Sequence, residues 1–343
     1  MKYNFIGNTG LLVSELCFGT MTFGGQEAGV WTKIGQLQQN EVDGILRAAI
    51  ESGINFIDTA NVYSFGQAEQ LLGQSLINLN IPRDEIVIAT KVYGKIKNKA
   101  NGSGLSRYHI FNAVEDSLRR LKLDYIDILY VHGMDPMTSL EHIVRSLNDV
   151  VESGKVRYIA ICNWPAWMVA KAQAIAHSHN WHPFIGLQYH YSAATRDIEH
   201  EIIPMAIDYN LAVFPWSPLS GGFLTGKYTR EGAKQTESRR VNFDFPPINK
   251  KVAYDLVDLL TELGKKYETG VAQLALAWVR QQTGVTSTII GAKTIEQLLS
   301  NVKSTTIELS ATDLDTIAKV SSLSEMYPGW MIKLQSEEIK FEG

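Results

Sequence analysis

The stretch Asn55-Phe-Ile-Asp58-Thr-Ala-Asn-Val-Tyr63-Ser-Phe-Gly66 places a carboxylate and a phenol five residues apart, just past an apolar run. Such a run is typical of a strand that is buried on both faces. A strand ending at Asp58 or Thr59 would deliver both polar groups to one rim of its sheet. Two further apolar runs end in the same way, one before Lys91 and one before His132. The fold therefore decides whether these four side chains meet.

Short β-branched runs alternate with helical patterns over most of the 343 residues. Strands are predicted at 15–20, 55–60, 86–92, 125–132, 156–162, 185–191, 211–216 and 286–291. Helices are predicted at 38–52, 67–78, 107–122, 138–153, 165–180, 196–209, 270–282 and 294–304. Eight strand-then-helix units favour an α/β fold of the (β/α)₈ TIM-barrel type, which residues 1–343 would form as a single domain.

Additional segments interrupt and follow these units. The interval after the seventh predicted strand is long enough for a loop at about 217–247 and an extra helix at about 248–266. Thr138-Ser-Leu-Glu141 and Thr294-Ile-Glu-Gln297 both fit a capping box, and Ser310 opens a further helix in the same manner. The C-terminal tail 323–343 is a candidate to cover the active-site face.

The competing architecture is a doubly wound sheet. In that fold the nucleotide site usually contains the motif Gly-x-Gly-x-x-Gly directly after the first strand. Here the nearest string is Gly102-Ser-Gly104, and Arg107 stands where the third glycine belongs. The barrel is therefore favoured, and in a barrel the carboxyl ends of the strands form the active-site face. Asp58, Tyr63, Lys91 and His132 would then converge.

Composition excludes several classes of function. A formal charge of −4 gives no basic field for nucleic acid. No apolar run is long enough for a signal peptide or a membrane span, so we expect a cytoplasmic protein without membrane partners. Cys17 and Cys162 lie inside apolar runs and are expected to be small buried hydrophobes. The histidines around His177 and His179 lack a matching carboxylate or cysteine set, so no metal site is predicted.

Several motifs recur in a fixed order along the chain. They are Gly19-Thr-Met-Thr-Phe-Gly24, the 58–66 segment continued by Ala68-Glu-Gln-Leu-Leu-Gly73, Leu129-Tyr-Val-His132, Gly154-Lys-Val-Arg-Tyr-Ile, Trp216-Ser-Pro-Leu-Ser-Gly-Gly-Phe-Leu-Thr-Gly-Lys-Tyr228 and Ile289-Ile-Gly-Ala-Lys293. Each alone is weak, but the ordered set resembles the aldo-keto reductase family over essentially the whole chain. The likeness is to bacterial-type members related to the potassium-channel beta-subunit branch.

The resemblance implies a catalytic tetrad of Asp58, Tyr63, Lys91 and His132. A hydride would pass from a nicotinamide ring to an aldehyde or ketone carbon while Tyr63 protonates the oxygen. A free phenol has a pKa of about 10, and the Lys91 ammonium would stabilise the phenolate. Asp58 would hold that ammonium, and His132 would orient the carbonyl. Taken singly, each residue is better explained as a cap, a core aromatic or a surface group.

The same resemblance implies NADP(H) as the cofactor, with NAD(H) less favoured. The carboxamide would meet Cys162, Asn163 and Gln188, and the ring would stack on Trp216. Lys293, with Gln297 and Asn301, resembles the clamp for the adenosine 2′-phosphate and adenine. The remaining cofactor contacts are expected at Gly19, Thr20, Met21, Asp58, Ser217, Pro218, Leu219, Gly221, Lys227 and Gly291. The family more often has Ser at position 162 and Tyr or Phe at position 216.

Several readings stay open. The substrate is a small-molecule carbonyl or alcohol, and the tetrad works in both directions, so a sugar or alcohol dehydrogenase is an alternative. A slow-turnover regulatory subunit that senses nicotinamide is another. A barrel hydrolase is disfavoured because no second acidic group stands beside Asp58 at the strand ends. Aromatic candidates for the substrate mouth are Trp31, Tyr93, Trp164 and Trp330. The sequence does not predict the physiological substrate or the oligomeric state.

Overall fold

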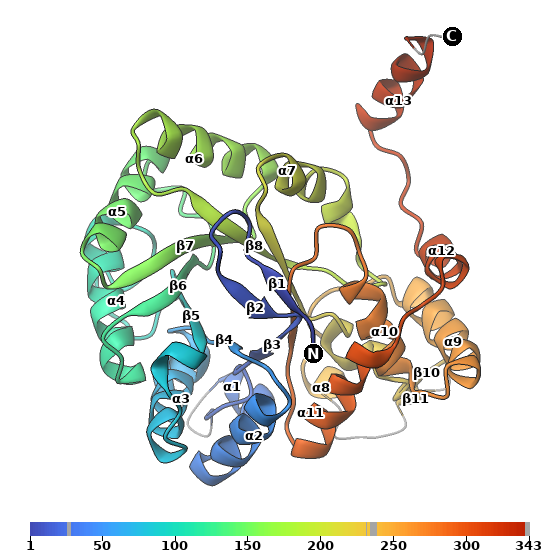
Figure 1. Cartoon of the computed structure of the whole chain (residues 1–343), viewed down its shortest axis with the longest axis horizontal. Helices are drawn as coiled ribbons and strands as arrows, with labels where there is room; N and C mark the ends of the chain where they lie inside the picture. The colour runs from blue at the N-terminus through green and yellow to red at the C-terminus, as the bar shows by residue number, and fades with distance from the viewer. Residues whose placement is uncertain (26–28, 231, 234–238, 340–343) are drawn as a thin grey trace.

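The computed structural model describes residues 1–25, 29–230, 232–233 and 239–339. Eight parallel strands form one sheet in the order β12-β3-β4-β5-β6-β7-β8-β9, and a parallel bridge between Val213 and Val285 brings its edges together (Figure 1). The strands are β3 (Leu16–Gly19), β4 (Phe56–Asp58), β5 (Val87–Val92), β6 (Ile126–Val131), β7 (Val156–Cys162), β8 (Phe184–His190), β9 (Ala212–Trp216) and β12 (Thr288–Ile290). The predicted (β/α)₈ barrel is confirmed.

Helices surround this barrel on all sides (Figure 1). The eight predicted helices correspond to α2 (Gln39–Glu51), α3 (Gln67–Asn78), α4 (Arg107–Leu121), α5 (Leu140–Glu152), α6 (Ala166–Ser178), α7 (Ile202–Asp208), α10 (Val271–Arg280) and α11 (Ile295–Val302). The additional helices are α9 (Lys250–Lys266) and α12 (Ala311–Val320). In the described part of the chain, no helix is long and apolar enough to cross a membrane.

Side-chain caps fix where several helices begin. The hydroxyls of Thr294 and Ser310 accept backbone N–H bonds from Gln297 and Asp313, as expected. The predicted cap of α5 is wrong by one residue, because Ser139 accepts the cap bond. The hydroxyl of Thr138 instead donates to Asp135 Oδ2 at 2.8 Å.

The barrel interior is a separate apolar cluster. It contains alternate residues of the strands, such as Val87 and Ala89 of β5, while Ile88 packs outward against the helices. Because both faces of each strand are covered, β5 is buried over its whole length, which explains its continuous apolar run. The polar exceptions within these strands include Asp58 and Lys91, and both are buried.

The sequence pattern missed a hairpin at the amino-terminal end of the barrel. Strands β1 (Tyr3–Phe5) and β2 (Leu12–Ser14) pair in antiparallel fashion and lie across that end (Figure 1). Ile6 and Val13 are buried in the interior cluster, so the hairpin plugs the barrel from below. Three residues of β1 are exposed, which leaves no apolar alternation to recognise.

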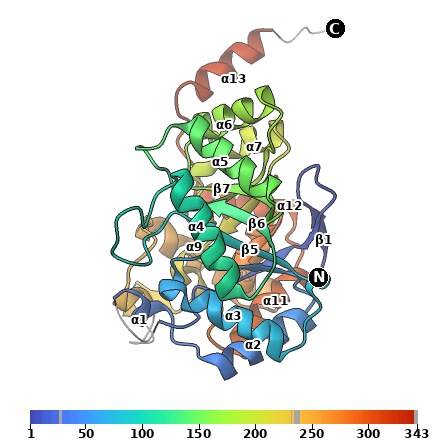
Figure 2. The same ribbon diagram turned by 90° about the vertical axis from the view of Figure 1, so that its left-hand side faces the viewer.

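Other missed elements are short or terminal. They are α1 (Trp31–Ile34), β10 (Tyr228–Thr229), β11 (Gly232–Ala233), α8 (Arg239–Asn242) and α13 (Gly329–Glu338). Three of them fall within the predicted 217–247 loop, of which residues 231 and 234–238 lie outside the described chain. Helix α13 projects from the side of the barrel beyond α7 and α12, rather than over the carboxyl-terminal rim (Figures 1 and 2). Its apolar side chains Ile332 and Leu334 are exposed there.

Candidate active site

The four predicted catalytic residues meet at the carboxyl ends of three neighbouring strands. Asp58 is the last residue of β4, Lys91 lies in β5, and His132 follows β6. Tyr63 begins the short helix η1 (Tyr63–Gly66) after β4. The turn is held by Ser64, which adopts a φ of 48° and donates its hydroxyl to the Phe23 carbonyl at 2.7 Å. This backbone conformation is unusual for a residue with a side chain, and it sets the direction of Tyr63.

Lys91 links these groups. Its Nζ lies 2.5 Å from Asp58 Oδ2, 2.8 Å from the Thr59 carbonyl oxygen and 3.4 Å from the Tyr63 hydroxyl. The side chain is fully buried. Burial acts to lower the pKa of Lys91, but the neighbouring Asp58 and Tyr63 outweigh it and raise that pKa above its usual range. Lys91 is therefore an ammonium at neutral pH.

Tyr63 is held in its protonated form. Burial raises its pKa, the Lys91 ammonium lowers it and the Asp58 carboxylate raises it, and the net result is about 12. We expected Lys91 to favour the phenolate. It does so, but the penalty for burying a charged phenolate is larger. At neutral pH the hydroxyl is therefore a proton donor.

His132 lies beside Tyr63, at the end of β6. The two ring centroids are 6.0 Å apart with an interplanar angle of 76°. Burial, with help from the Lys91 charge, lowers the pKa of His132 to about 3. A neutral imidazole keeps one N–H donor and one acceptor, so it can orient a carbonyl without competing for the proton.

The predicted cofactor residues occupy the rest of the rim. Except for Asp58 in β4, they lie near or after the carboxyl ends of strands β7, β8, β9, β12 and β3, which are contiguous around the barrel. The tetrad lies near or after the carboxyl ends of β4, β5 and β6. Gly19 pairs in register with Asp58, and Val131 pairs with Ile161 at the border between β6 and β7, so the two groups adjoin. A Cβ on Gly19 would lie 2.9 Å from the Ile289 side chain, so a larger residue here would force a neighbour to shift. Both Cys17 and Cys162 are buried free thiols, as expected.

The two amides expected to contact a carboxamide also have protein partners. Asn163 Nδ2 donates to the His132 carbonyl at 3.3 Å, and Asn163 Oδ1 accepts from Trp216 Nε1 at 3.1 Å. Gln188 Nε2 donates to Asp58 Oδ1 at 2.8 Å. These bonds connect the cofactor side of the rim directly with the tetrad.

Trp216 stands in an aromatic stack that the sequence did not reveal. His190 stacks on it with centroids 4.7 Å apart, and Phe245 lies nearly parallel at 6.1 Å. Phe245 belongs to a segment tied down by Arg240, whose Nε donates to the Ser220 carbonyl at 2.7 Å. The Arg240 guanidinium also bonds the Pro246 carbonyl. No local motif indicates this role of Arg240, because its partners Ser220 and Pro246 come close only when the loop is folded.

The loop after β9 and the start of α11 complete this side. Ser217 Oγ accepts from the Gly221 N–H at 2.8 Å, and Gly221 and Gly222 adopt positive φ. Pro218 and Leu219 lie between Ser217 and Gly221 in the chain, and Lys227 follows the glycines. Lys293 stands at the amino end of α11, with its backbone N–H bonded to Gln297 Oε1 at 2.9 Å. Further along α11, Asn301 donates to the Gly291 carbonyl.

The aromatic candidates for the mouth separate into three groups. Trp31 lies beside the tetrad, with its ring centroid 5.8 Å from that of Tyr63. Tyr93 packs on Gly133, next to His132. Trp164 is buried and donates to the Gly133 carbonyl, so it supports the rim from within. Trp330 is on α13 and away from the rim (Figure 1).

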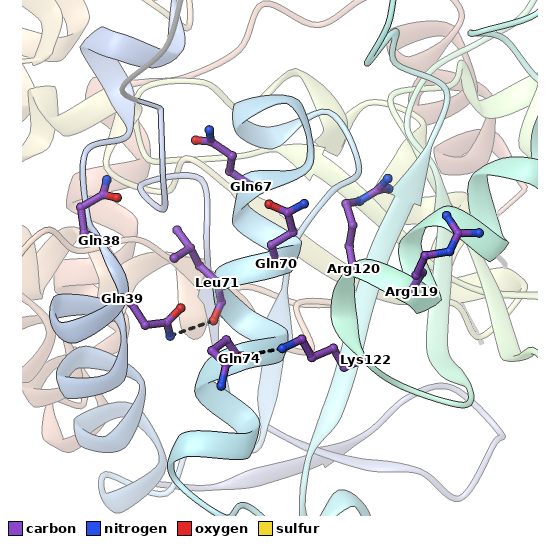
Figure 3. A pocket seen from close by; sticks show the side chains of 9 residues that line it. All are labelled: Gln38, Gln39, Gln67, Gln70, Leu71, Gln74, Arg119, Arg120 and Lys122. Atoms are coloured by element: carbon purple, nitrogen blue, oxygen red, sulfur yellow. Dashed lines mark hydrogen bonds between the residues drawn. The ribbon is translucent and has the colours of Figure 1, made fainter.

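A polar groove of about 630 Å³ lies elsewhere, on the outer helical layer. Figure 3 shows its lining side chains, which include five glutamines of α2 and α3 and three cations near the end of α4. Arg120 and Arg119 are paired with Glu69 and Asp116. Cations at a helix C-terminus also stabilise the helix itself, so this groove does not require a ligand.

The histidines of the rim predict a loss of stability in acid. Burial, with the Arg240 charge, lowers the pKa of His190 to about 4, and His132 is at about 3. Below about pH 6.5 these histidines bind protons in the unfolded chain but stay neutral in the folded chain. Stability should therefore be constant above about pH 6.5 and fall towards pH 4. Urea unfolding midpoints from pH 7.5 to pH 4.5 measure this, and His132→Asn should weaken the slope. An unchanged slope in His132→Asn would contradict the assignment.

Comparison with known proteins agrees with the fold. The family model for the aldo/keto reductase family matches residues 15–322. A putative aryl-alcohol dehydrogenase of Schizosaccharomyces pombe is 35% identical over 91% of this chain and 93% of its own length. An uncharacterized oxidoreductase of Bacillus subtilis is 35% identical, covering 96% of this chain and 97% of its own. A probable voltage-gated potassium channel subunit beta of Oryza sativa is 33% identical, covering 88% and 90%. The chain belongs to the aldo/keto reductase family.

Proposed function

We propose that this oxidoreductase reduces an aldehyde or ketone to an alcohol, with NADP(H) as the hydride source and Tyr63 as the proton donor. The observation that carries the proposal is the position of Lys91 Nζ, 2.5 Å from Asp58 and 3.4 Å from the Tyr63 hydroxyl. A buried phenol with a pKa of about 12 holds its proton at neutral pH. The adjacent ammonium limits the cost of losing that proton in the transition state.

Each residue then has one task. The bound nicotinamide would supply the hydride to the carbonyl carbon. Tyr63 donates its proton to the carbonyl oxygen, and neutral His132 hydrogen-bonds that oxygen and fixes its direction. Lys91 stabilises the developing phenolate, and Asp58 holds Lys91. The same groups work in reverse, but oxidation requires the phenolate form, which is scarce at neutral pH.

The rim offers groups that suit a nicotinamide dinucleotide. Trp216 provides a flat ring, and the buried hydroxyl of Thr20 has no partner in the described chain. In the loop after Ser217, Gly221 and Gly222 adopt positive φ, and glycine is the residue that lets a backbone approach a ligand closely. Lys293 stands just before α11, and its positive charge together with the amino end of that helix would favour binding of a 2′-phosphate. This last group supports NADP(H) over NAD(H).

An aromatic substrate is favoured by the mouth. Trp31 lies 5.8 Å from Tyr63 and gives an aromatic ring a surface to pack on. The Schizosaccharomyces pombe relative carries the name aryl-alcohol dehydrogenase. We therefore propose a benzaldehyde-like carbonyl as the substrate class. The similarity to the potassium-channel subunit beta supports the alternative proposal, a regulatory subunit with slow turnover.

Consumption of NADPH with a panel of aromatic and aliphatic aldehydes, ketones and sugars tests the proposal. We expect turnover with aromatic aldehydes to exceed that with aliphatic ones, and kcat/KM to be higher for NADPH than for NADH. Parallel assays with NADP⁺ and alcohols report the reverse direction. Tight NADPH binding with negligible turnover across the panel would favour the regulatory role instead.

A further inference from the structure

One hydrogen bond crosses the barrel beneath the proposed proton donor. Gln188 on β8 donates from Nε2 to Asp58 Oδ1 on β4 at 2.8 Å. In the sheet order, β4 and β8 are four strands apart among eight, so they face each other across the interior. The two residues are 130 positions apart in the chain. The bond therefore joins the cofactor side of the rim to the tetrad side.

The environment makes this bond important to Asp58. Both side chains are buried, with Gln188 3% exposed and Asp58 2% exposed. The other carboxylate oxygen, Oδ2, is occupied by Lys91 at 2.5 Å. In the interior cluster below them, Phe56 has no polar group, and the Tyr130 hydroxyl interacts with Gln188. A carboxylate with one donor on each oxygen has its orientation fixed.

We propose that Gln188 is a positioning residue for proton transfer. Its amide fixes the Asp58 carboxylate, Asp58 fixes the Lys91 ammonium, and Lys91 stands beside the Tyr63 hydroxyl. An amide has a second N–H and a carbonyl oxygen, so this bond is compatible with a simultaneous cofactor contact. Gln188 thereby connects cofactor binding with the geometry of the acid. The inference rests on the proposed function for its kinetic consequence, but the bond itself is testable without turnover.

The kinetic test replaces Gln188 by Met, which keeps the length of the side chain and removes its donor. We expect kcat at saturating NADPH to fall by roughly 10-fold, a part of the contribution that a positioned general acid makes. The loss should largely disappear when Gln188→Met is added to Asp58→Asn, because coupled residues are not additive. A raised KM for NADPH with an unchanged saturating kcat would overturn the proposal and leave Gln188 as a cofactor contact only.

The second test uses cofactor-free protein and needs no activity. Urea unfolding is measured for wild type, Gln188→Met, Asp58→Asn and the double variant. We expect the two substitutions to be non-additive. The matched control is Gln173→Met, because buried Gln173 bonds only the Phe184 backbone on both its amide atoms among the contacts described. Gln173→Met should be additive with Asp58→Asn. Additivity of Gln188→Met in a folded protein would overturn the proposal, whether or not the protein turns over any carbonyl.

Discussion

Replacement of Tyr63 by Phe should lower kcat for carbonyl reduction by about 10²–10⁴-fold, the contribution of a positioned general acid. The substitution removes one hydroxyl, whose pKa of about 12 keeps it protonated at neutral pH. The aromatic ring remains between Trp31 and His132. Binding of NADPH, measured by quenching of protein fluorescence, should therefore change little.

Tyr130→Phe is the matched control for this experiment. The Tyr130 ring lies 5.7 Å from Lys91 Nζ, and its buried hydroxyl interacts with Gln188. This variant should keep kcat within a few-fold of wild type. If Tyr63→Phe retained comparable turnover, another group would have to donate the proton.

Replacement of Lys91 by Met should remove both activity and stability. The Asp58 carboxylate would stay buried with its ammonium partner gone, and breaking a buried pair on one side costs about 3–5 kcal/mol. Lys91 also lowers the pKa of Tyr63, so that pKa should rise further and kcat should fall. Urea unfolding at pH 7.5 and steady-state kinetics measure the two effects.

The double variant Asp58→Asn/Lys91→Met separates pairing from packing. Because this variant has no unpaired buried carboxylate, it should unfold at a higher urea concentration than Lys91→Met alone, although it stays inactive. If the destabilisation of the double variant equals the sum of the two single effects, loss of the ion pair does not cause the instability of Lys91→Met.

Local sequence predicted the elements that carry their own signal. β5 is apolar throughout because both of its faces are covered, and the tetrad stands directly after such runs. The β1–β2 hairpin was missed because every residue of β1 is exposed and the strand shows no apolar alternation. Helix α5 is capped by Ser139 because the Thr138 hydroxyl bonds to Asp135 instead. Both outcomes depend on contacts in the folded chain, which the local pattern of apolar residues does not indicate.

Within the site, the family resemblance implied that Lys91 contacts Asp58 and Tyr63, whereas the other contacts could not be predicted. The bond from Gln188 to Asp58 spans 130 positions, and no pattern in either strand indicates it. The stacking of His190 and Phe245 on Trp216 depends on a loop held by Arg240. The pKa of Tyr63 depends on burial, which is a property of the assembled rim.

The division of the rim into two arcs has a consequence for how such proteins diversify. In the proposed function, strands β4 to β6 hold the acid and its supports, while β7 to β3, through β12, would face the cofactor. On that proposal, mutations at Lys293 should alter the preference for one dinucleotide while leaving the reaction intact. Gln188 belongs to both arcs, so a change there alters two properties at once. Attempts to redesign coenzyme choice should accordingly begin at α11 and keep Gln188 fixed.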